Sequence, residues 1–275
     1  MSSHLLYDTQ IESVNRAFSK QSENFDEEDL ANPILQAMRK QVYDHVDALG
    51  LKPSSRILEL NAGTGIDAHH FVRQGHTVHA TDLSDGMVNK IAQRIQRFSL
   101  ENVLSCQQLS YTELDELATS SFDFVFSNFG GLNCVDDLQK VTRHLRGHLN
   151  NGALITWVIM PPVCPIEIGS FLRGNVKSAF RRFNRGGVIS HLEGEFFKTY
   201  YHSLADIKAA FQSGFKFLKS EGLGSLSPQP HQERFARNHK GFYRMMCALD
   251  SGLREHFPFN QWADHIIVSF RYESS

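Results

Sequence analysis

The chain has 275 residues, of which 41% are hydrophobic, so it is long enough to fold around one large core or around one core with an inserted cap. Its 28 lysines and arginines nearly balance 30 aspartates and glutamates, and the net charge of −2 gives no electrostatic reason to expect nucleic acid or a membrane as a partner. The four cysteines are dispersed and lack CxxC spacing, and the sequence has neither a signal-peptide pattern nor an apolar run of membrane-spanning length. These features favour a soluble, cytoplasmic protein with a small-molecule partner and leave the oligomeric state open.

Helical and strand patterns alternate regularly after residue 32. Asn32 is a possible N-cap and Pro33 occupies the first helical position of a segment with helical apolar spacing, which predicts a helix that Gly50 closes. A short apolar run over 56–60 predicts a buried strand. The alternation then continues through a helix at 66–74, a strand at 77–82, a helix from 84, strands at 102–108 and 122–128, a helix at 135–149 and a strand at 153–160.

This alternation divides the chain into four expected parts. Residues 1–32 are expected to form an N-terminal lid, 33–162 a cofactor-binding core, and the Phe- and Arg-rich segment 163–200 a cap insertion. Residues 201–275 resume the core, with a helix from Ser203, a strand near 215–221, a helix near 239–256 and a last strand from His265. Strands separated by helices imply right-handed crossovers, and hence an α/β fold with a parallel sheet and helices on both faces.

The stretch ELNAGTG, residues 59–65, lies where the first strand turns into a helix, the usual position of a ligand in such sheets. Gly63 and Gly65 let the backbone turn tightly and approach a ligand, and Asp82 ends the next strand, where a carboxylate can accept both hydroxyls of a ribose. GTGIDA also satisfies the G-x-G-x-x-A pattern of dinucleotide-binding enzymes. Glu59 favours a cationic ligand instead, because a carboxylate there would repel a pyrophosphate.

These motifs resemble those of the class I S-adenosylmethionine-dependent methyltransferases. ILELNAGTG resembles the family's first motif and ATDLSDGM its second, while SCQQLSYTEL and FDFVFSNFGGLNCV resemble the ends of the third and fourth strands. The resemblance covers residues 33–160. It implies a Rossmann-like, seven-stranded, mostly parallel sheet with the cap after the fifth strand, and S-adenosylmethionine as cofactor, with S-adenosylhomocysteine as product.

The resemblance also implies a set of cofactor contacts. These are Glu59, Asn61, Ala62, Gly63, Gly65, Asp82, Leu83, Met87, Gln108, Leu109, Ser110, Asn128 and Phe129. The chain departs from the family at two places, since Asn61 replaces the usual first glycine and the segment 107–110 lacks the aspartate that often binds the adenine amino group.

Methyl transfer from a sulfonium is an in-line displacement, so the protein must chiefly align an acceptor and exclude water. If the acceptor is a hydroxyl, a base would help to remove its proton, and His202, Tyr200 and His191 are candidates by position. The alternative is that each of them is a hydrogen-bonded structural residue. The accepting atom is not indicated by the sequence.

Three further residues are candidates for substrate binding. Phe25 either contacts the sulfonium by cation–π attraction or simply packs in the lid. Arg181 and Arg182 belong to a basic run that starts at Arg173; they either recognise an anionic group of the acceptor or form a solvated helix face. No spacing of histidines with carboxylates or cysteines suggests a metal. The alternative functions are an NAD(P)-dependent oxidoreductase and a non-catalytic cofactor-binding protein.

Overall fold

The computed structural model describes residues 3–169, 174 and 176–274 around a seven-stranded sheet with the strand order β3-β2-β1-β4-β5-β9-β8. Within this sheet β9 alone runs antiparallel to its neighbours, β5 and β8. The strands are β1 (Arg56–Leu60), β2 (Thr77–Asp82), β3 (Leu104–Gln108), β4 (Phe122–Ser127), β5 (Leu149–Ile159), β8 (Phe215–Leu223) and β9 (His265–Tyr272). The expected seven-stranded, mostly parallel α/β fold is confirmed.

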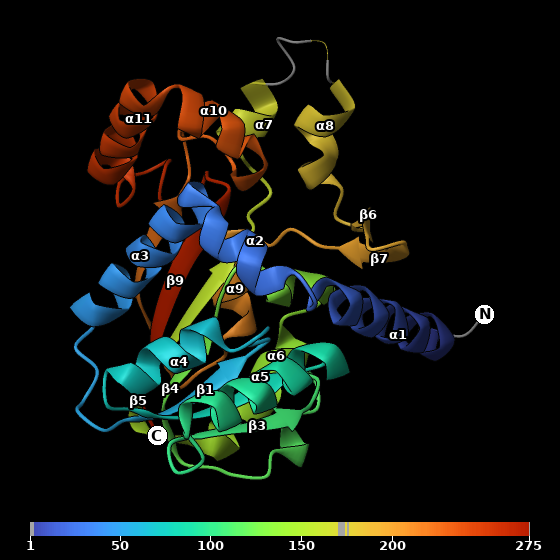
Figure 1. Cartoon of the computed structure of the whole chain (residues 1–275), viewed down its shortest axis with the longest axis vertical. Coiled ribbons are helices and arrows are strands. Elements are labelled where there is room, and N and C mark those ends of the chain that lie inside the picture. Colours follow the sequence, from blue (N-terminus) through green and yellow to red (C-terminus); the bar gives the residue numbers. More distant parts are fainter. Residues whose placement is uncertain (1–2, 170–173, 175, 275) are drawn as a thin grey trace.

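Helices cover both faces of the sheet (Figure 1), and each face has its own apolar core. Side chains that alternate along the strands divide between them: Ile57 and Phe124 pack towards α3, α4 and α5, whereas Leu58 and Val125 pack towards α6 and α9. The helices are α3 (Pro33–Ala48), α4 (Ile66–Arg73), α5 (Asp85–Phe98), α6 (Gln139–Leu145), α9 (Leu204–Ala210), α10 (Glu233–Asn238) and α11 (Lys240–Leu253). None of the described helices is long and apolar enough to cross a membrane.

The helix starts agree with the cap residues in the sequence. The Asn32 side chain accepts hydrogen bonds from the first backbone amides of α3, and Pro33 follows it. Ser203 and Asp206 form a complete capping box at α9. Ser84 accepts a hydrogen bond from the backbone of Met87 and so begins α5 directly after β2. These caps fix where the chain leaves each strand, and therefore where the strand-end loops lie.

The segment before β5 differs from the expected long helix at 135–149. It consists of α6, a single 3-10 turn over Arg146–His148, and a strand that already begins at Leu149. The strand starts early because Leu149 pairs with Phe122, and an irregularity follows before Leu154 pairs with Phe124. Gly152, at φ 83°, supplies the left-handed backbone inside this irregularity, which the apolar run in the sequence did not reveal.

The lid and the cap contact each other beside the sheet (Figure 1). The cap segment contains α7 (Pro165–Gly169), α8 (Val176–Phe180) and a hairpin of β6 (Val188–Leu192) and β7 (Glu195–Thr199); Arg173 lies outside the described residues. The lid consists of α1 (Ser3–Gln21) and α2 (Phe25–Ala31). The Gln10 side chain bonds both the N–H and the C=O of Lys198 at 2.8 Å, and Arg16 and Lys20 pair with Glu195. These contacts join α1 to β7.

Candidate functional site

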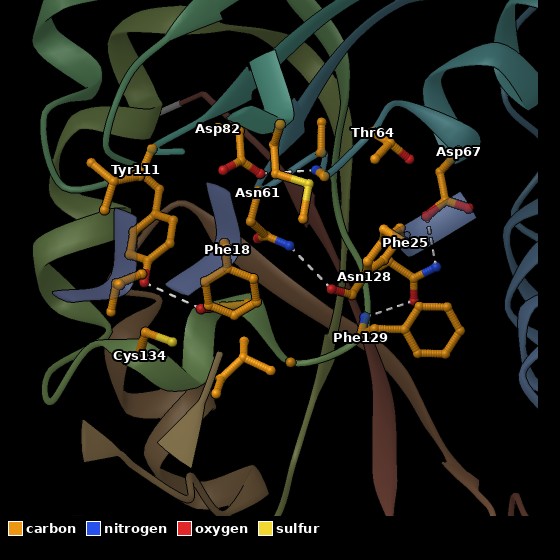
Figure 2. Close-up of a pocket in the computed structure, with 18 of the residues that line it drawn as sticks. Phe18, Phe25, Asn61, Thr64, Asp67, Asp82, Tyr111, Asn128, Phe129 and Cys134 are labelled. Carbon is orange, nitrogen blue, oxygen red and sulfur yellow. Dashed lines mark hydrogen bonds between the residues drawn. The ribbon is translucent and has the colours of Figure 1, made fainter. Parts of the chain in front are cut away.

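Asp82 lies at the end of β2, facing the turn that follows β1. One carboxylate oxygen accepts the Gly63 N–H at 2.8 Å (Figure 2). The other accepts the Ser84 N–H at 2.9 Å. Burial raises the pKa of Asp82 to about 6, against the lowering effect of these backbone hydrogen bonds. Each oxygen of an ionised carboxylate has a second acceptor direction, so this group can accept two further hydrogen bonds from a vicinal diol.

Positions 63 and 65 of the turn require glycine for different physical reasons. Gly63 lines the cavity at φ 56°, and a Cβ added there would meet only Phe25, at 4.0 Å. A Cβ at Gly65 would lie 3.2 Å from the Cγ1 atom of Ile91, and Gly65 adopts a left-handed conformation at the start of α4. Gly65 is therefore required by the packing of the turn against α5, and it does not line the cavity as the sequence reasoning assumed.

A cavity of about 360 Å³ extends from Asp82 to the cap hairpin. Nine of the predicted site residues line it: Phe25, Asn61, Ala62, Gly63, Asp82, Leu83, Met87, Asn128 and Phe129. The sequence reasoning missed its remaining walls, which come from the lid, from α3, from the strand-end loops and from the cap. They are Val14, Phe18, Arg39, Thr64, Ile66, Asp67, Tyr111, Gly130, Gly131, Cys134, Met160, Ser190, Leu192, Phe197 and Thr199.

Glu59 lies behind the cavity wall and not in it. It is 1% exposed, and its Oε2 atom has no hydrogen-bond partner among the described residues. Burial, together with repulsion from Asp67 and Asp82, raises the pKa of Glu59 well above its usual range, although Arg39 opposes this. The neutral acid is therefore favoured unless a further positive charge comes close to it.

The loop after β3 meets the cavity one residue later than expected. Gln108, Leu109 and Ser110 do not line it, and the Gln108 side chain donates to the backbone oxygen of Leu83 at 3.0 Å. Tyr111 takes their place in the wall, with its hydroxyl donating to the backbone oxygen of Gly131 at 3.2 Å. The predicted adenine contacts of 108–110 stay untested, and Tyr111 is the side chain that this loop presents to the cavity.

Asn61 joins the loops that follow β1 and β4. Its side chain donates to the backbone oxygen of Asn128 at 3.1 Å (Figure 2) and accepts the Ser127 hydroxyl at 2.6 Å. A Cβ added at Gly131 would lie 2.4 Å from the Asn61 Cγ atom, so the two loops are in direct contact. This bridge explains why the chain has a side chain where the family usually has glycine.

A buried ionic cluster supports the cavity beneath the lid. Arg39 pairs with Asp29 at 2.8 Å and also with Asp67, which accepts hydrogen bonds from Tyr43 at 2.5 Å and from Asn128 at 3.0 Å. Burial acts to raise the pKa of Asp67. Arg39, Tyr43 and Asn128 outweigh this effect and together hold that pKa below its usual range. Among the described residues that line the cavity, Arg39 is the one cation, and its Nε–H has no partner there.

The lid is latched to the glycine turn. Asp26 accepts hydrogen bonds from the Thr64 hydroxyl and, at 2.5 Å, from Arg94. Arg94 also donates to the Thr64 backbone oxygen at 2.9 Å, so one guanidinium joins α2, α5 and the turn. This latch places Phe25 over Gly63, where an aromatic ring can face a bound cation.

The three predicted base candidates lie outside the cavity lining. His202 is buried and its Nε2 atom is 3.0 Å from the backbone oxygen of Val135, while Tyr200 lines separate surface depressions with residues of the cap. His191 lies in β6, with its ring 4.7 Å from that of Phe196. Their catalytic roles stay untested predictions.

The two predicted acceptor-binding arginines are engaged elsewhere. Arg182 is 4% exposed and bonds Glu167 at 2.6 Å and Asp264 at 2.7 Å, and Arg181 pairs with Glu167 at 2.8 Å. Cys164 lies close enough to both carboxylates for metal-ligand spacing, but the Arg182 guanidinium already bridges them. This cluster anchors the cap to the start of β9, and recognition of an acceptor by these arginines stays untested.

Comparisons with known proteins concern the family and the fold of the chain. A family profile described as a methyltransferase domain matches residues 58–155. A demethylmenaquinone methyltransferase of Beutenbergia cavernae is 32% identical over 142 residues, which is 50% of this chain and 56% of that protein, so the match spans little more than half of the relative.

Solved structures show the same fold. The 1,6-didemethyltoxoflavin-N1-methyltransferase of Burkholderia thailandensis matches with a TM-score of 0.58 at 13% identity, over 100% of this chain and 92% of that one. The geranyl diphosphate C-methyltransferase of Streptomyces coelicolor A3(2) matches with a TM-score of 0.55 at 12% identity, over 85% and 79%. At these identities the likeness shows the fold alone. The profile and the sequence relative support a class I S-adenosylmethionine-dependent methyltransferase over the part of the chain that they match, and the solved structures add that the fold is the same.

Proposed function

We propose that the chain binds S-adenosylmethionine at the Asp82 end of the cavity and transfers its methyl group to a small, largely apolar acceptor. The residues present fit this cofactor. Asp82 can accept the two ribose hydroxyls, and Leu83 and Met87 offer apolar contacts for the adenine. Arg39, the one cation among the described residues that line the cavity, can attract the carboxylate of the methionyl part, and Phe25 can face the sulfonium.

A nicotinamide cofactor suits this site less well. Asp67 lines the cavity with its pKa held below the usual range, so a pyrophosphate bound against the turn would be repelled by an ionised carboxylate. A cationic ligand would instead draw the pKa of Glu59 down and stabilise the ionised form. The family assignment points the same way, so the oxidoreductase alternative is not favoured.

The acceptor end of the cavity is formed by the lid and the cap. Phe18, Met160, Leu192 and Phe197 supply apolar walls, and the neighbouring hydroxyl of Thr199 is already bonded to that of Ser190 at 2.7 Å. The charged residues among the described lining, Arg39, Asp67 and Asp82, all lie towards the cofactor end. An acceptor that enters here meets few groups that could replace lost hydration, which favours an uncharged molecule.

The bound cofactor supplies an electrophilic methyl group on a positively charged sulfur. The chain's own contribution is to hold the acceptor in line behind that methyl and to exclude water by the latch of Asp26 with Arg94. Cys134 is the thiol of the lining, and burial raises its pKa to about 12, with a smaller effect from Asp82. This thiol stays protonated at neutral pH, so the acceptor must be nucleophilic without help from it.

The proposal is tested by transfer of a radiolabelled methyl group to candidate acceptors. The substrates named for the relatives, demethylmenaquinone, 1,6-didemethyltoxoflavin and geranyl diphosphate, are the first to try. An uncharged cavity end predicts that the first two are better acceptors than the diphosphate. Binding of S-adenosylmethionine with no transfer to any acceptor, including small-molecule extracts, would favour a non-catalytic cofactor-binding protein.

The four cysteines are unpaired, which is consistent with a reducing compartment and supports a cytoplasmic location. The near-balanced charge of the chain gives no reason to propose a nucleic-acid partner.

A further inference from the structure

Helix α11 exposes an apolar face to solvent. Phe242, Met245 and Leu249 recur at helical spacing and are 48%, 50% and 47% exposed, and Ala248 between them is also exposed. A helix on the surface of a globular protein normally turns such a face towards the core. The inward side of α11 packs Tyr243 against the core and is also held through Asp250, whose carboxylate accepts the backbone N–H groups of residues 226 and 227, so the outer apolar face is additional.

The face continues onto α10. The Phe235 ring, 41% exposed, packs edge to face against Phe242 with ring centroids 5.9 Å apart. Because the Phe235 ring contacts Phe242, and Phe242, Met245 and Leu249 share one face of α11, the apolar side chains form a single ridge across both helices. We call these four residues, Phe235, Phe242, Met245 and Leu249, the α10–α11 ridge. Exposed apolar clusters of this kind mark surfaces that bind something.

The charged side chains of α10 and α11 that have no ion-pair partner all have one sign. Arg234, Lys240 and Arg244 are exposed, and none of them has an ion-pair partner within the part of the chain that the structure describes. The acidic residues of the two helices are already engaged, because Glu233 pairs with Arg237 and Asp250 is buried. The ridge with its cations is therefore complementary to a surface that is apolar beneath and negatively charged at its rim.

We propose that the α10–α11 ridge binds the headgroup region of an anionic lipid bilayer, with the ridge residues inserted and the three cations at the phosphates. Large apolar side chains on the outer side of a helix can insert into a fluid bilayer surface, which adapts to their shape, whereas a rigid protein groove would have to match it. A second copy of the chain is the less favourable occupant, because a symmetric pairing would bring two sets of unpaired cations together, while the carboxylates of these helices are already engaged or buried. The net charge of −2 does not describe this face, because it averages over the whole molecule.

The position of the ridge connects it to the cavity. Arg237 of α10 donates to the backbone oxygen of Ala31, and the Asn32 side chain donates to that of Pro230 at 3.0 Å. The helix pair thus rests on the junction between α2 and α3, which is the end of the lid. An apolar acceptor of the kind proposed above dissolves in a bilayer. A chain docked through the ridge would therefore hold its lid close to the bilayer that contains the acceptor.

The test is co-sedimentation of the full chain with vesicles of phosphatidylcholine and phosphatidylglycerol, compared with phosphatidylcholine alone. We expect binding to the anionic vesicles, with Phe242→Ser plus Met245→Ser weakening it at least about tenfold. Lys240→Glu plus Arg244→Glu should weaken it by at least about fivefold per charge and remove most of its salt dependence. The matched control is Arg97→Glu plus Phe98→Ser, an exposed cation and aromatic ring on α5, at the other end of the molecule (Figure 1), and it should bind as the unmodified chain does.

Absence of binding to anionic vesicles, or an equal loss in the control, would overturn the proposal. A dimer in sedimentation velocity without lipid that the ridge variants abolish would assign the ridge to a second copy and overturn it as well. Vesicle binding is measured without cofactor or acceptor, so its outcome is independent of whether methyl transfer is found. Unchanged thermal unfolding of the variants checks that each of them folds.

Discussion

Replacement of Asp82 by alanine tests its proposed role as the carboxylate that binds the cofactor's ribose. Each of its oxygens already accepts one backbone N–H, from Gly63 and from Ser84, and has one acceptor direction left. The substitution therefore removes two hydrogen bonds to ribose and leaves two backbone donors without their partner. Since water can replace part of these bonds, we expect S-adenosylmethionine to bind more weakly by about 1–3 kcal/mol, which is about five- to 150-fold in Kd.

Isothermal titration calorimetry with S-adenosylmethionine and with S-adenosylhomocysteine measures this change. Both ligands contain the ribose, so both should lose affinity to a similar extent. Asp44→Ala is the matched control, because Asp44 is an exposed aspartate that pairs only with Lys40 on the outer side of α3. An unchanged Kd for the Asp82 variant, or an equal loss in the control, would refute the assigned role of Asp82.

Three further predictions concern the same site and its supports. Because burial raises the pKa of Asp82 to about 6 and only the ionised acid accepts both hydroxyls, cofactor affinity should rise as the pH increases through 6 and level off above it; calorimetry that finds a flat profile from pH 5 to 8 would contradict this. Gly131→Ala places a methyl against the Asn61 side chain and should lower the free energy of unfolding by about 1–3 kcal/mol, checked by urea denaturation, with Gly147→Ala as a control in open space. Arg182→Met leaves the buried Asp264 without its arginine and takes one of two arginines from Glu167, so it should cost about 3–5 kcal/mol in the same assay, whereas a loss below 1 kcal/mol would contradict the anchoring role of this arginine.

The sequence predicted the sheet well because its signals are local. The cap at Asn32, the capping box at Ser203 and the apolar strand over 56–60 each depend on neighbouring residues, and each has the expected structure. The strand-end positions Gly63 and Asp82 were also predictable, since parallel strands end at one edge of the sheet. The local sequence pattern did not predict which residue of the loop after β3 lines the cavity, where Tyr111 takes the place of the expected residues 108–110.

The rest of the cavity depends on contacts between distant segments. Arg39 and Asp67 are 28 residues apart, and neither belongs to a motif that marks a site. The cap residues Ser190 and Phe197 reach the cavity only because the hairpin packs against α1, a contact with no signature in the sequence. Glu59 shows the converse, since its motif position is correct but its side chain lies behind the wall.

The most direct test of the central claim is calorimetric titration of the whole chain with S-adenosylmethionine and, separately, with NAD. The arrangement of Asp82, Glu59 and Arg39 predicts binding of S-adenosylmethionine at one site per chain and no measurable heat from NAD at the same concentrations. Tight binding of NAD without binding of S-adenosylmethionine would contradict the assignment of this cavity to an adenosyl cofactor with a positive charge.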